Sequence, residues 1–365
     1  MSIFRMPAEW EPHEATWIAW PHNPKDWPGK FPPIHWIYVE IVRHLHRNER
    51  VEILVEDDRL HRRVRKMLSD AGVDLERVGF HRMGTDRSWL RDSGPTFVTD
   101  GDEVAAVCWR FNAWAKYSNW LKDVLVSRKI AEIERCRPIT PEVRGERVVL
   151  EGGAIDSNGA GSLLTTEECL LSEDVQQRNP GMTRGDYEAL FAEHLGVTNT
   201  IWCERGIVGD DTHGHVDDLA RFVGPRTVAT VVETDRKDDN YEPLKRNWEF
   251  LKKQKDQDGK ALEILELPMP KPLYFRGVRT PASYANFYIA NGLVLVPTFH
   301  DPNDRIALNV LASAFPGRDV IGIHSVDYVW GFGTLHCSTQ QQPLGRVCGN
   351  EIVPAAKTNV VRERS

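Results

Sequence analysis

The sequence lacks the features that mark several large classes of protein. None of its six cysteines forms a Cys-x-x-Cys pair, and there is neither a glycine-rich dinucleotide fingerprint nor a phosphate-binding loop. No apolar run approaches the roughly 18 residues that a membrane helix needs. No run of Lys and Arg suggests binding to nucleic acid or lipid head groups. We therefore expect neither nucleic acid nor a membrane among the partners.

The beginning of the chain lacks the apolar segment and the cleavage pattern of a secretory signal. The scattered cysteines are therefore expected to be free thiols in a reducing compartment, which predicts a cytoplasmic protein. Cys108, Cys169 and Cys203 lie in apolar, strand-like text and are interpreted as small buried hydrophobic residues.

The chain has 365 residues, 41% of them hydrophobic, and a formal net charge of −7. This length can bury a large core, and no low-complexity linker interrupts it, so we expect a single domain over residues 1–365. The mild acidic excess suits a cationic small substrate but is equally ordinary among proteins. The oligomeric state stays open, with a homo-oligomer among the alternatives.

Strand, hairpin and helix patterns recur every few tens of residues, which predicts mixed α/β modules around one centre. Hairpins are expected at Asp100-Gly101 and Asn291-Gly292, and strands 147–150 and 162–166 are expected to pair around Asn158-Gly159. The first 36 residues hold five tryptophans, most of which are expected to pack over the domain surface. Helical spacing predicts helices over residues 58–72, 124–133, 183–195, 241–253 and 305–315.

Two acidic residues precede glycines in patterns that are typical of ligand sites. Asp92 lies in an Arg-Asp-Ser-Gly-Pro stretch that predicts a loop with the aspartate at its tip. The alternative is a turn aspartate that accepts backbone N–H groups. Glu151 ends an apolar strand and precedes Gly152 and Gly153, which permit close approach of a ligand. The alternative there is a bulge with a solvated glutamate.

The stretch His213-Gly214-His215-Val216-Asp217 places three titratable groups at alternate positions. In an extended segment His213, His215 and Asp217 would project from the same face. One interpretation is a metal site, since His-x-His occurs among metal ligands. The other is a proton-transfer histidine beside a substrate-binding aspartate.

Cys337 follows Gly331 and Gly333 and precedes three glutamines. A buried structural cysteine more often lies in an apolar strand. This polar context favours an exposed turn that carries a nucleophilic thiol.

Taken in order, these stretches resemble the agmatine deiminase family, which is grouped with the Porphyromonas-type peptidylarginine deiminases in the guanidine-modifying superfamily. The resemblance implies an α/β (α+β) fold of the pentein type, an α/β propeller of five pseudo-symmetric ββαβ-like modules around a central active-site channel. It implies a hydrolase that converts agmatine to N-carbamoylputrescine and ammonia, in putrescine biosynthesis, through a covalent thiouronium and without a cofactor or metal. It rests on residues 6–13, 89–98, 111–114, 151–153, 165–171, 178–180, 214–217, 283–288 and 336–341.

The resemblance also implies roles, residue by residue. Cys337 would be the nucleophile, and His215 would be the general acid and base. Asp92 and Asp217 would hold the guanidinium nitrogens of a small cationic guanidine. Glu151 would complete the anionic cage and orient His215.

The chain departs from the family pattern near the substrate. Many members have Gly-Gly-Gly-Asn where Phe332 and Thr334 stand, and two glycines where Ala115 and Lys116 follow residue 114. We expect Phe332 and Thr334 to reshape the mouth beside the nucleophile and Lys116 to alter what the entrance accepts. Trp89 would pack on the aliphatic arm of the substrate.

Several rival functions stay open at this point. The same mechanism would serve free or peptidyl arginine, and an amidinotransferase of the same superfamily would pass the amidino group to an amine. A metal-dependent amidohydrolase would use His213 and His215, but the further ligands that it needs are not found. A non-catalytic guanidine-binding module would tolerate loss of Cys337.

Overall fold

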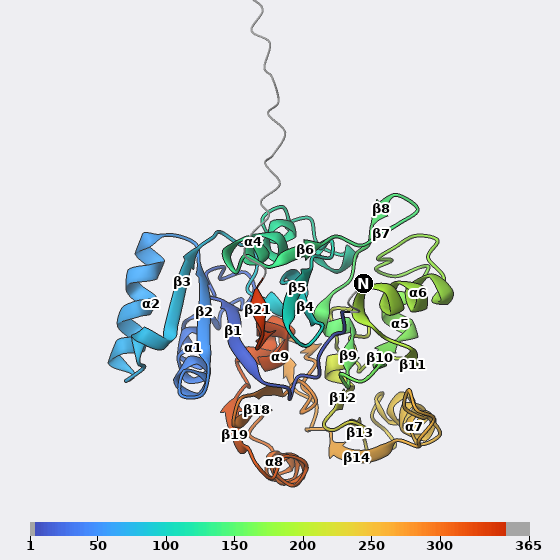
Figure 1. Cartoon of the computed structure of the whole chain (residues 1–365). Helices are drawn as coiled ribbons and strands as arrows, with labels where there is room; N and C mark the ends of the chain where they lie inside the picture. Colours follow the sequence, from blue (N-terminus) through green and yellow to red (C-terminus); the bar gives the residue numbers. More distant parts are fainter. Residues whose placement is uncertain (1–3, 348–365) are drawn as a thin grey trace, which may run out of the picture.

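The computed structural model describes residues 4–347, and within that range five sheets of three or four strands surround a common centre (Figure 1). Each sheet contains an antiparallel strand pair, then a helix, then a third strand parallel to the second. The helix is needed because two parallel neighbours can be joined only by a long crossover. The repeated ββαβ order confirms the five-module α/β propeller that the sequence predicts.

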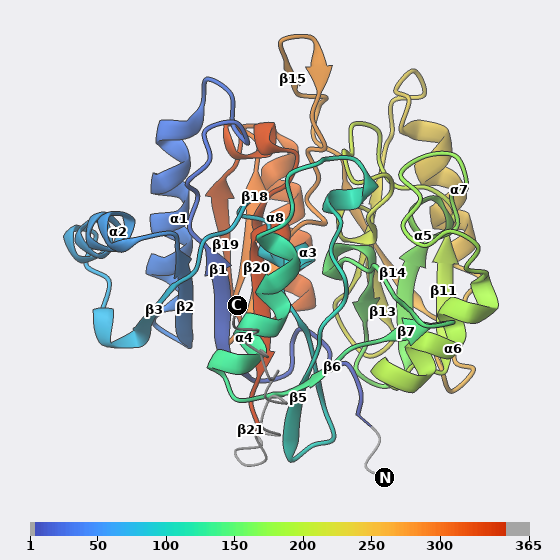
Figure 2. The ribbon, with the colours of Figure 1, turned by 90° about the horizontal axis from the view of Figure 1, so that it is seen from above.

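Four of the modules follow one another along the chain, and their helices lie on the outside of the ring (Figure 1). Figure 2 shows α1 and α2 flanking one side of the molecule and α6 and α7 the other. The four consist of β4 (Thr96–Thr99), β5 (Glu103–Val107), α4 (Val126–Ile133) and β6 (Arg137–Ile139); β9 (Asp156–Ser157), β10 (Ser162–Thr166), α6 (Arg184–Leu195) and β11 (Asn199–Cys203); β12 (Ala220–Phe222), β13 (Thr227–Val232), α7 (Tyr241–Leu251) and β14 (Glu263–Pro268); and β17 (Tyr288–Ala290), β18 (Leu293–Thr298), α8 (Asn303–Ala314) and β19 (Asp319–His324).

The fifth module joins the two ends of the described chain. Its central strand β1 pairs antiparallel with β20 and parallel with β2, so the ring is closed by backbone hydrogen bonds between distant segments. Pairing with β20 covers the edge of β1 that would otherwise be open. The module consists of β20 (Thr339–Pro343), β1 (His13–Ala19), α1 (Phe31–Leu45) and β2 (Arg50–Val55), extended by α2 (Asp58–Asp70) and β3 (Val78–Arg82).

Smaller elements connect or extend the modules. Within residues 4–347 no helix combines the length and the apolar content that crossing a bilayer would require. The smaller elements are α3 (Leu90–Ser93), β7 (Glu142–Val143), β8 (Glu146–Arg147), α5 (Glu167–Leu170), β15 (Tyr274–Phe275), β16 (Val278–Arg279), α9 (Leu335–Ser338) and β21 (Arg346–Val347).

Local signals in the sequence placed several element ends correctly. Thr183 caps α6 in a reciprocal capping box with Asp186, and Gly196 ends the helix with a φ of 67°. Gly292 has a φ of 72° in the hairpin between β17 and β18. The predicted pairing of 147–150 with 162–166 is wrong, because Asp156–Ser157 pairs with β10 instead.

The expectation for the early tryptophans is also wrong. Trp17, Trp20 and Trp27 are buried, and Trp36 is the one with most of its surface exposed. Trp17 lies in β1, the strand at the middle of the closing sheet. The segment therefore belongs to the core, since it supplies the strand that joins both ends of the chain.

Cys108, Cys169 and Cys203 are buried in hydrophobic clusters, as the sequence predicts. Cys348 lies outside the described residues.

Candidate active site

Each module delivers a short segment to the centre immediately before its first strand. The segments include α3 before β4 and α9 before β20, and neighbouring segments contact one another. Residues that occupy the same position in different modules therefore lie close together at the centre of the ring. The segments carry one polar residue from each of the five modules: Asp92, Glu151, Asp217, Asn286 and Cys337.

Cys337 is buried in α9 and borders a cavity of about 570 Å³. Asn286 Nδ2 donates to its sulfur at 3.1 Å, and Asp217 Oδ2 lies 3.7 Å from the same atom. Asn286 Oδ1 accepts from Thr334 Oγ1 at 2.7 Å and from the backbone N–H of His336 at 3.0 Å. The expectation of an exposed turn at Cys337 is wrong, because the segment is a buried helical turn inside the ring.

Sequence reasoning gave Asn286 no role, although it lies within one of the family-like stretches. In the structure Asn286 comes directly before the module that begins with β17, and its side chain contacts the sulfur of Cys337. Its place two residues before β17 matches the place of Cys337 two residues before β20. That module equivalence is the signal that would have found it.

His215 lies among three buried carboxylates. Its Nδ1 is 3.9 Å from Asp92 Oδ1 and 4.0 Å from Asp217 Oδ1, and its Nε2 is 3.8 Å from Glu151 Oε2. Within residues 4–347, His215 Nε2, Glu151 Oε2 and Asp217 Oδ1 have no hydrogen-bond partner. Buried polar atoms without partners are costly, so a ligand that donates N–H groups would relieve the two carboxylate oxygens.

Each of the three carboxylates also accepts a hydrogen bond from a neighbouring group of the protein. These contacts leave a fixed cage whose remaining acceptors face the histidine. The contacts are Trp114 Nε1 to Asp92 Oδ2 at 2.8 Å, Gly153 N to Asp92 Oδ1 at 3.0 Å, Arg178 Nε to Glu151 Oε1 at 3.0 Å, and His336 Nδ1 to Asp217 Oδ2 at 2.8 Å.

Burial and mutual charge set the protonation of the site. Burial lowers the pKa of His215, but Asp92 and the other acidic neighbours outweigh it and raise that pKa well above its ordinary value. Burial raises the pKa of Asp92 to about 6 against the opposing effect of His215. Burial, reinforced by Asp217, raises the pKa of Cys337 well above its ordinary value. These shifts favour an imidazolium and a protonated thiol.

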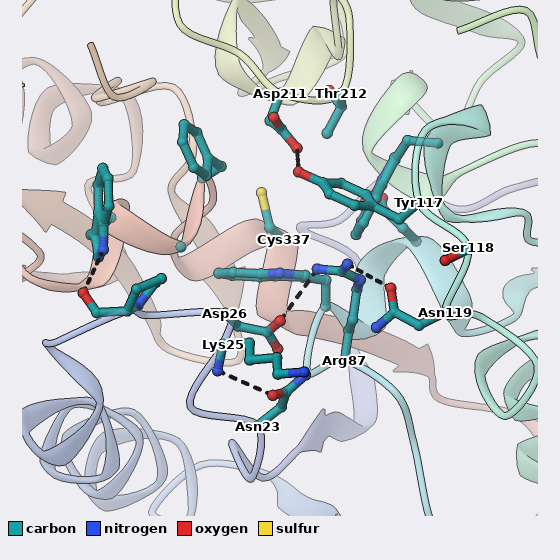
Figure 3. Close-up of a pocket in the computed structure, with 17 residues that line it drawn as sticks. Asn23, Lys25, Asp26, Arg87, Tyr117, Ser118, Asn119, Asp211, Thr212 and Cys337 are labelled. Carbon is teal, nitrogen blue, oxygen red and sulfur yellow. Dashed lines mark hydrogen bonds and ion pairs between the residues drawn. The ribbon is translucent and has the colours of Figure 1, made fainter. Parts of the chain in front are cut away.

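Figure 3 shows Cys337 among the residues that line the cavity, with Arg87, Tyr117 and Asp211 around it. Trp89, Asp92, Trp330 and Phe332 also line it. A Cβ on Gly333 would lie 2.9 Å from Trp89 and 3.2 Å from the sulfur of Cys337, so glycine keeps this part of the cavity open.

The structure corrects the expectation for one of the departures from the family pattern. Phe332 lines the cavity, as expected for a residue beside the nucleophile. Its backbone has a φ of 64°. Thr334 is buried and donates to Asn286 instead. It therefore acts on the support of Cys337 and not on the shape of the entrance.

The expectation that His213, His215 and Asp217 share one face is wrong. His213 is half-buried with a φ of 67°, and its ring lies 3.9 Å from Glu168. The segment turns sharply there and continues as a single helical turn, Val216–Asp218. Within residues 4–347 the group that could share a metal ion consists of Glu151, Cys169 and His215, without His213.

Gly153 allows the cage to form, which gives a first prediction. A Cβ at this position would lie 2.5 Å from His215 Nδ1 and 3.0 Å from Asp92 Oδ1. Gly153→Ala is expected to lower kcat/KM for the guanidine substrate about 100-fold, because small misplacements of reacting groups are costly. Steady-state kinetics of the purified variant would measure this.

Gly185→Ala is the matched control, because its added Cβ in α6 would meet nothing closer than 3.9 Å. Wild-type kinetics in Gly153→Ala would mean that the cage is not where the chemistry takes place.

Comparison with known proteins identifies the group to which this arrangement belongs. The model of the family described as Porphyromonas-type peptidyl-arginine deiminase matches residues 5–343. The chain belongs to this family. The agmatine deiminase of Stutzerimonas stutzeri (strain A1501) is 36% identical over 364 residues, with 93% of this chain and 95% of that protein covered.

Solved structures of the family resemble this one along nearly the whole chain. An agmatine deiminase of Enterococcus faecalis is 32% identical, with a TM-score of 0.85, and 93% of this chain and 96% of that chain are covered. A C. jejuni agmatine deiminase with substrate bound is 31% identical, with a TM-score of 0.83 and coverage of 94% and 97%. The pentein-type propeller is therefore the fold of both this chain and its family.

Proposed function

We propose that this member of the family hydrolyses agmatine to N-carbamoylputrescine and ammonia, with Cys337 as the nucleophile. The observation that carries the proposal is the convergence of Cys337, His215 and three carboxylates in one cluster, of which Cys337 and Asp92 line the cavity. The names of the relatives, agmatine deiminases of several bacteria, support agmatine as the substrate.

The carboxylates bind the guanidinium. Asp92 and Asp217 accept its N–H groups, and Glu151 completes a cage around the planar cation. Charge-assisted bidentate contacts align the carbon with the sulfur and keep the positive charge that makes the carbon electrophilic. Trp89, which lines the cavity, packs on the aliphatic arm.

The first half of the reaction forms a covalent bond and releases ammonia. Burial and the neighbouring carboxylates raise the pKa of Cys337. Binding of a cation offsets the carboxylates, so the thiol releases its proton to solvent and the thiolate forms. The thiolate adds to the guanidinium carbon while Asn286 donates to the sulfur. The imidazolium of His215 then protonates one departing nitrogen, and ammonia leaves a thiouronium on Cys337.

The second half hydrolyses this thiouronium. Neutral His215 takes a proton from water, and the resulting hydroxide adds to the same carbon. Collapse of the adduct breaks the carbon–sulfur bond, frees the ureido product and restores the thiolate. The hydroxyl proton passes to solvent, from which the thiolate regains its proton and the ammonia released in the first half takes up one proton to become ammonium.

The test is ammonia release from agmatine, arginine and a blocked peptidyl arginine, each with and without iodoacetamide. We expect turnover of agmatine that alkylation abolishes. Agmatine turnover that survives complete alkylation of Cys337 would overturn the thiol mechanism. Turnover of the blocked peptide alone would overturn agmatine as the substrate.

The pH dependence follows from Asp92. Burial raises its pKa to about 6, so below that pH the carboxyl is protonated and loses the charge that binds the guanidinium. We expect kcat/KM for agmatine to fall about tenfold per pH unit below about pH 6, since this quantity reports ionisations of the free enzyme. A profile that stays flat to about pH 5 would contradict ionised Asp92 as a binding group.

A further inference from the structure

We propose that Glu9 and His336 are positioning residues of the reaction, which together fix the orientation and the negative charge of Asp217. The inference rests on the proposed function, in which Asp217 accepts N–H groups of the substrate. It assigns a role to one residue of the stretch 6–13, for which the sequence predicted no function.

The imidazole of His336 lies between two buried carboxylates. Its Nδ1 is 2.8 Å from Asp217 Oδ2, and its Nε2 is 2.8 Å from Glu9 Oε2. All three side chains are at most 5% exposed. Because an ionised carboxylate can only accept hydrogen bonds, the ring donates from both nitrogens, as an imidazolium does. His336 therefore ties Asp217 to Glu9 and brings a positive charge to both.

Glu9 is a fixed anchor for this bridge. Its Oε2 also accepts from Arg221 Nη2 at 2.7 Å, and its Oε1 accepts from the backbone N–H of Ile289 at 2.6 Å. Arg221 belongs to β12 and Ile289 to β17, so Glu9 joins the N-terminal segment to two other modules. Because both of its oxygens are held, Glu9 cannot turn away from His336 without breaking these contacts.

The carboxylates of the site differ in the partner that holds them. Burial raises the pKa of Glu151, but Arg178 and the other neighbours outweigh it and lower that pKa to about 2. Burial also raises the pKa of Asp217, but the hydrogen bond and the charge of His336 lower it by more. Asp92 accepts from neutral N–H donors, and burial raises its pKa to about 6. A cationic partner therefore keeps a buried carboxylate of this site ionised.

Asp218 shows how strongly burial acts on a carboxyl at this place. It follows Asp217 in the chain, and burial, reinforced by Asp217, raises its pKa well above the ordinary value. We therefore expect the pKa of Asp217 to rise when the charge of His336 is lost. The other charged and titratable groups around Asp217 are the cations His215, Arg221 and Arg91 and the acids Asp92, Asp218 and Cys337.

The test is the pH dependence of agmatine turnover in two variants. His336→Asn keeps an amide that can donate to Asp217 but removes the charge, and it leaves the contact of Glu9 with Arg221 intact. Glu9→Gln removes the charge that holds His336 as a double donor. We expect kcat/KM for agmatine at about pH 6 to fall about tenfold in both variants, and the acid limb to move up by about one pH unit. The deficit should narrow above about pH 8, because higher pH restores the charge of Asp217.

Asp156→Asn is the matched control. Asp156 is buried like Glu9, and its Oδ1 accepts from Nε of the same Arg221 at 2.7 Å. Its replacement disturbs the same buried ion pairs but leaves the bridge from Glu9 to Asp217 in place, so its pH profile should match that of the wild type. An acid limb that moves as far in Asp156→Asn as in Glu9→Gln would mean that these ion pairs serve only stability, and the inference would fail. Thermal unfolding shows whether each purified variant is folded.

The outcomes separate this inference from the proposed function. Turnover of agmatine by the wild type, with an unchanged pH profile in both variants, would overturn the inference alone. If the wild type releases no ammonia from agmatine, the proposed function fails, and calorimetric titration of Cys337→Ala with agmatine at about pH 6 decides the inference. Binding that is weakened by adding His336→Asn, but not by adding Asp156→Asn, would support it. Equal binding in all three proteins, or absence of binding, would overturn it.

Discussion

Replacement of Cys337 by alanine is expected to lower the rate of ammonia release from agmatine on the order of 10⁴-fold or more, because the covalent intermediate forms on its sulfur. The sulfur borders the cavity, and its nearest polar neighbours are Asn286 and Asp217. Guanidine binding should survive in this variant, since the carboxylates that would hold the cation remain. An ammonia assay and calorimetric titration with agmatine measure the two effects separately.

The matched control is Cys203→Ala. Cys203 is buried in a hydrophobic cluster away from the cavity, so its loss should alter stability more than turnover. Undiminished turnover by Cys337→Ala would refute covalent catalysis at this position. Loss of agmatine binding as well as turnover would mean that the variant has lost the structure of the site.

Replacement of Asp217 by asparagine is expected to lower kcat/KM for agmatine about 10³-fold, the effect of losing more than one charge-assisted hydrogen bond. Asp217 Oδ1 is buried without a partner within residues 4–347, and Oδ2 accepts from His336 at 2.8 Å. Asparagine preserves the size of the side chain but removes the charge that aligns the guanidinium. Steady-state kinetics with agmatine provides the measurement.

Asp218→Asn is the control for this substitution. Burial, together with Asp217, raises the pKa of Asp218 well above its ordinary value, whereas the pKa of Asp217 is lowered against the effect of burial by its hydrogen bond with His336. Replacing the carboxyl that is more readily protonated by an amide should change kcat/KM less than about tenfold. Equal losses in the two variants would indicate that packing, and not the charge of Asp217, explains the effect.

Much of the candidate site could be predicted from the sequence because its residue types are unusual in their settings. Local sequence patterns selected five residues, and the structure brings all of them together: Cys337, His215, Glu151, Asp92 and Asp217. Their catalytic roles are the subject of the predictions above. His213 was grouped with them by alternation alone, which failed because a left-handed residue turns the chain there.

Other features could not be predicted because no local pattern carries them. Asn286 is a short polar residue in apolar text, and its contact with the sulfur of Cys337 joins segments 51 residues apart. Trp17 was misjudged because its burial depends on β20 pairing with β1 across almost the whole chain. Contacts of this range depend on ring closure and not on periodicity.

The sequence by itself determined the alternation of strands and helices, the chemical groups and the family. Hydrophobic period, capping residues and turn glycines act over a few neighbours, so they can be recognised in a linear text. Only the tertiary structure shows which groups meet, how burial and neighbouring charges shift their pKa values, and that Lys116 is paired with Asp211. These properties depend on distances between modules, which exist only after the two ends of the chain have closed the ring.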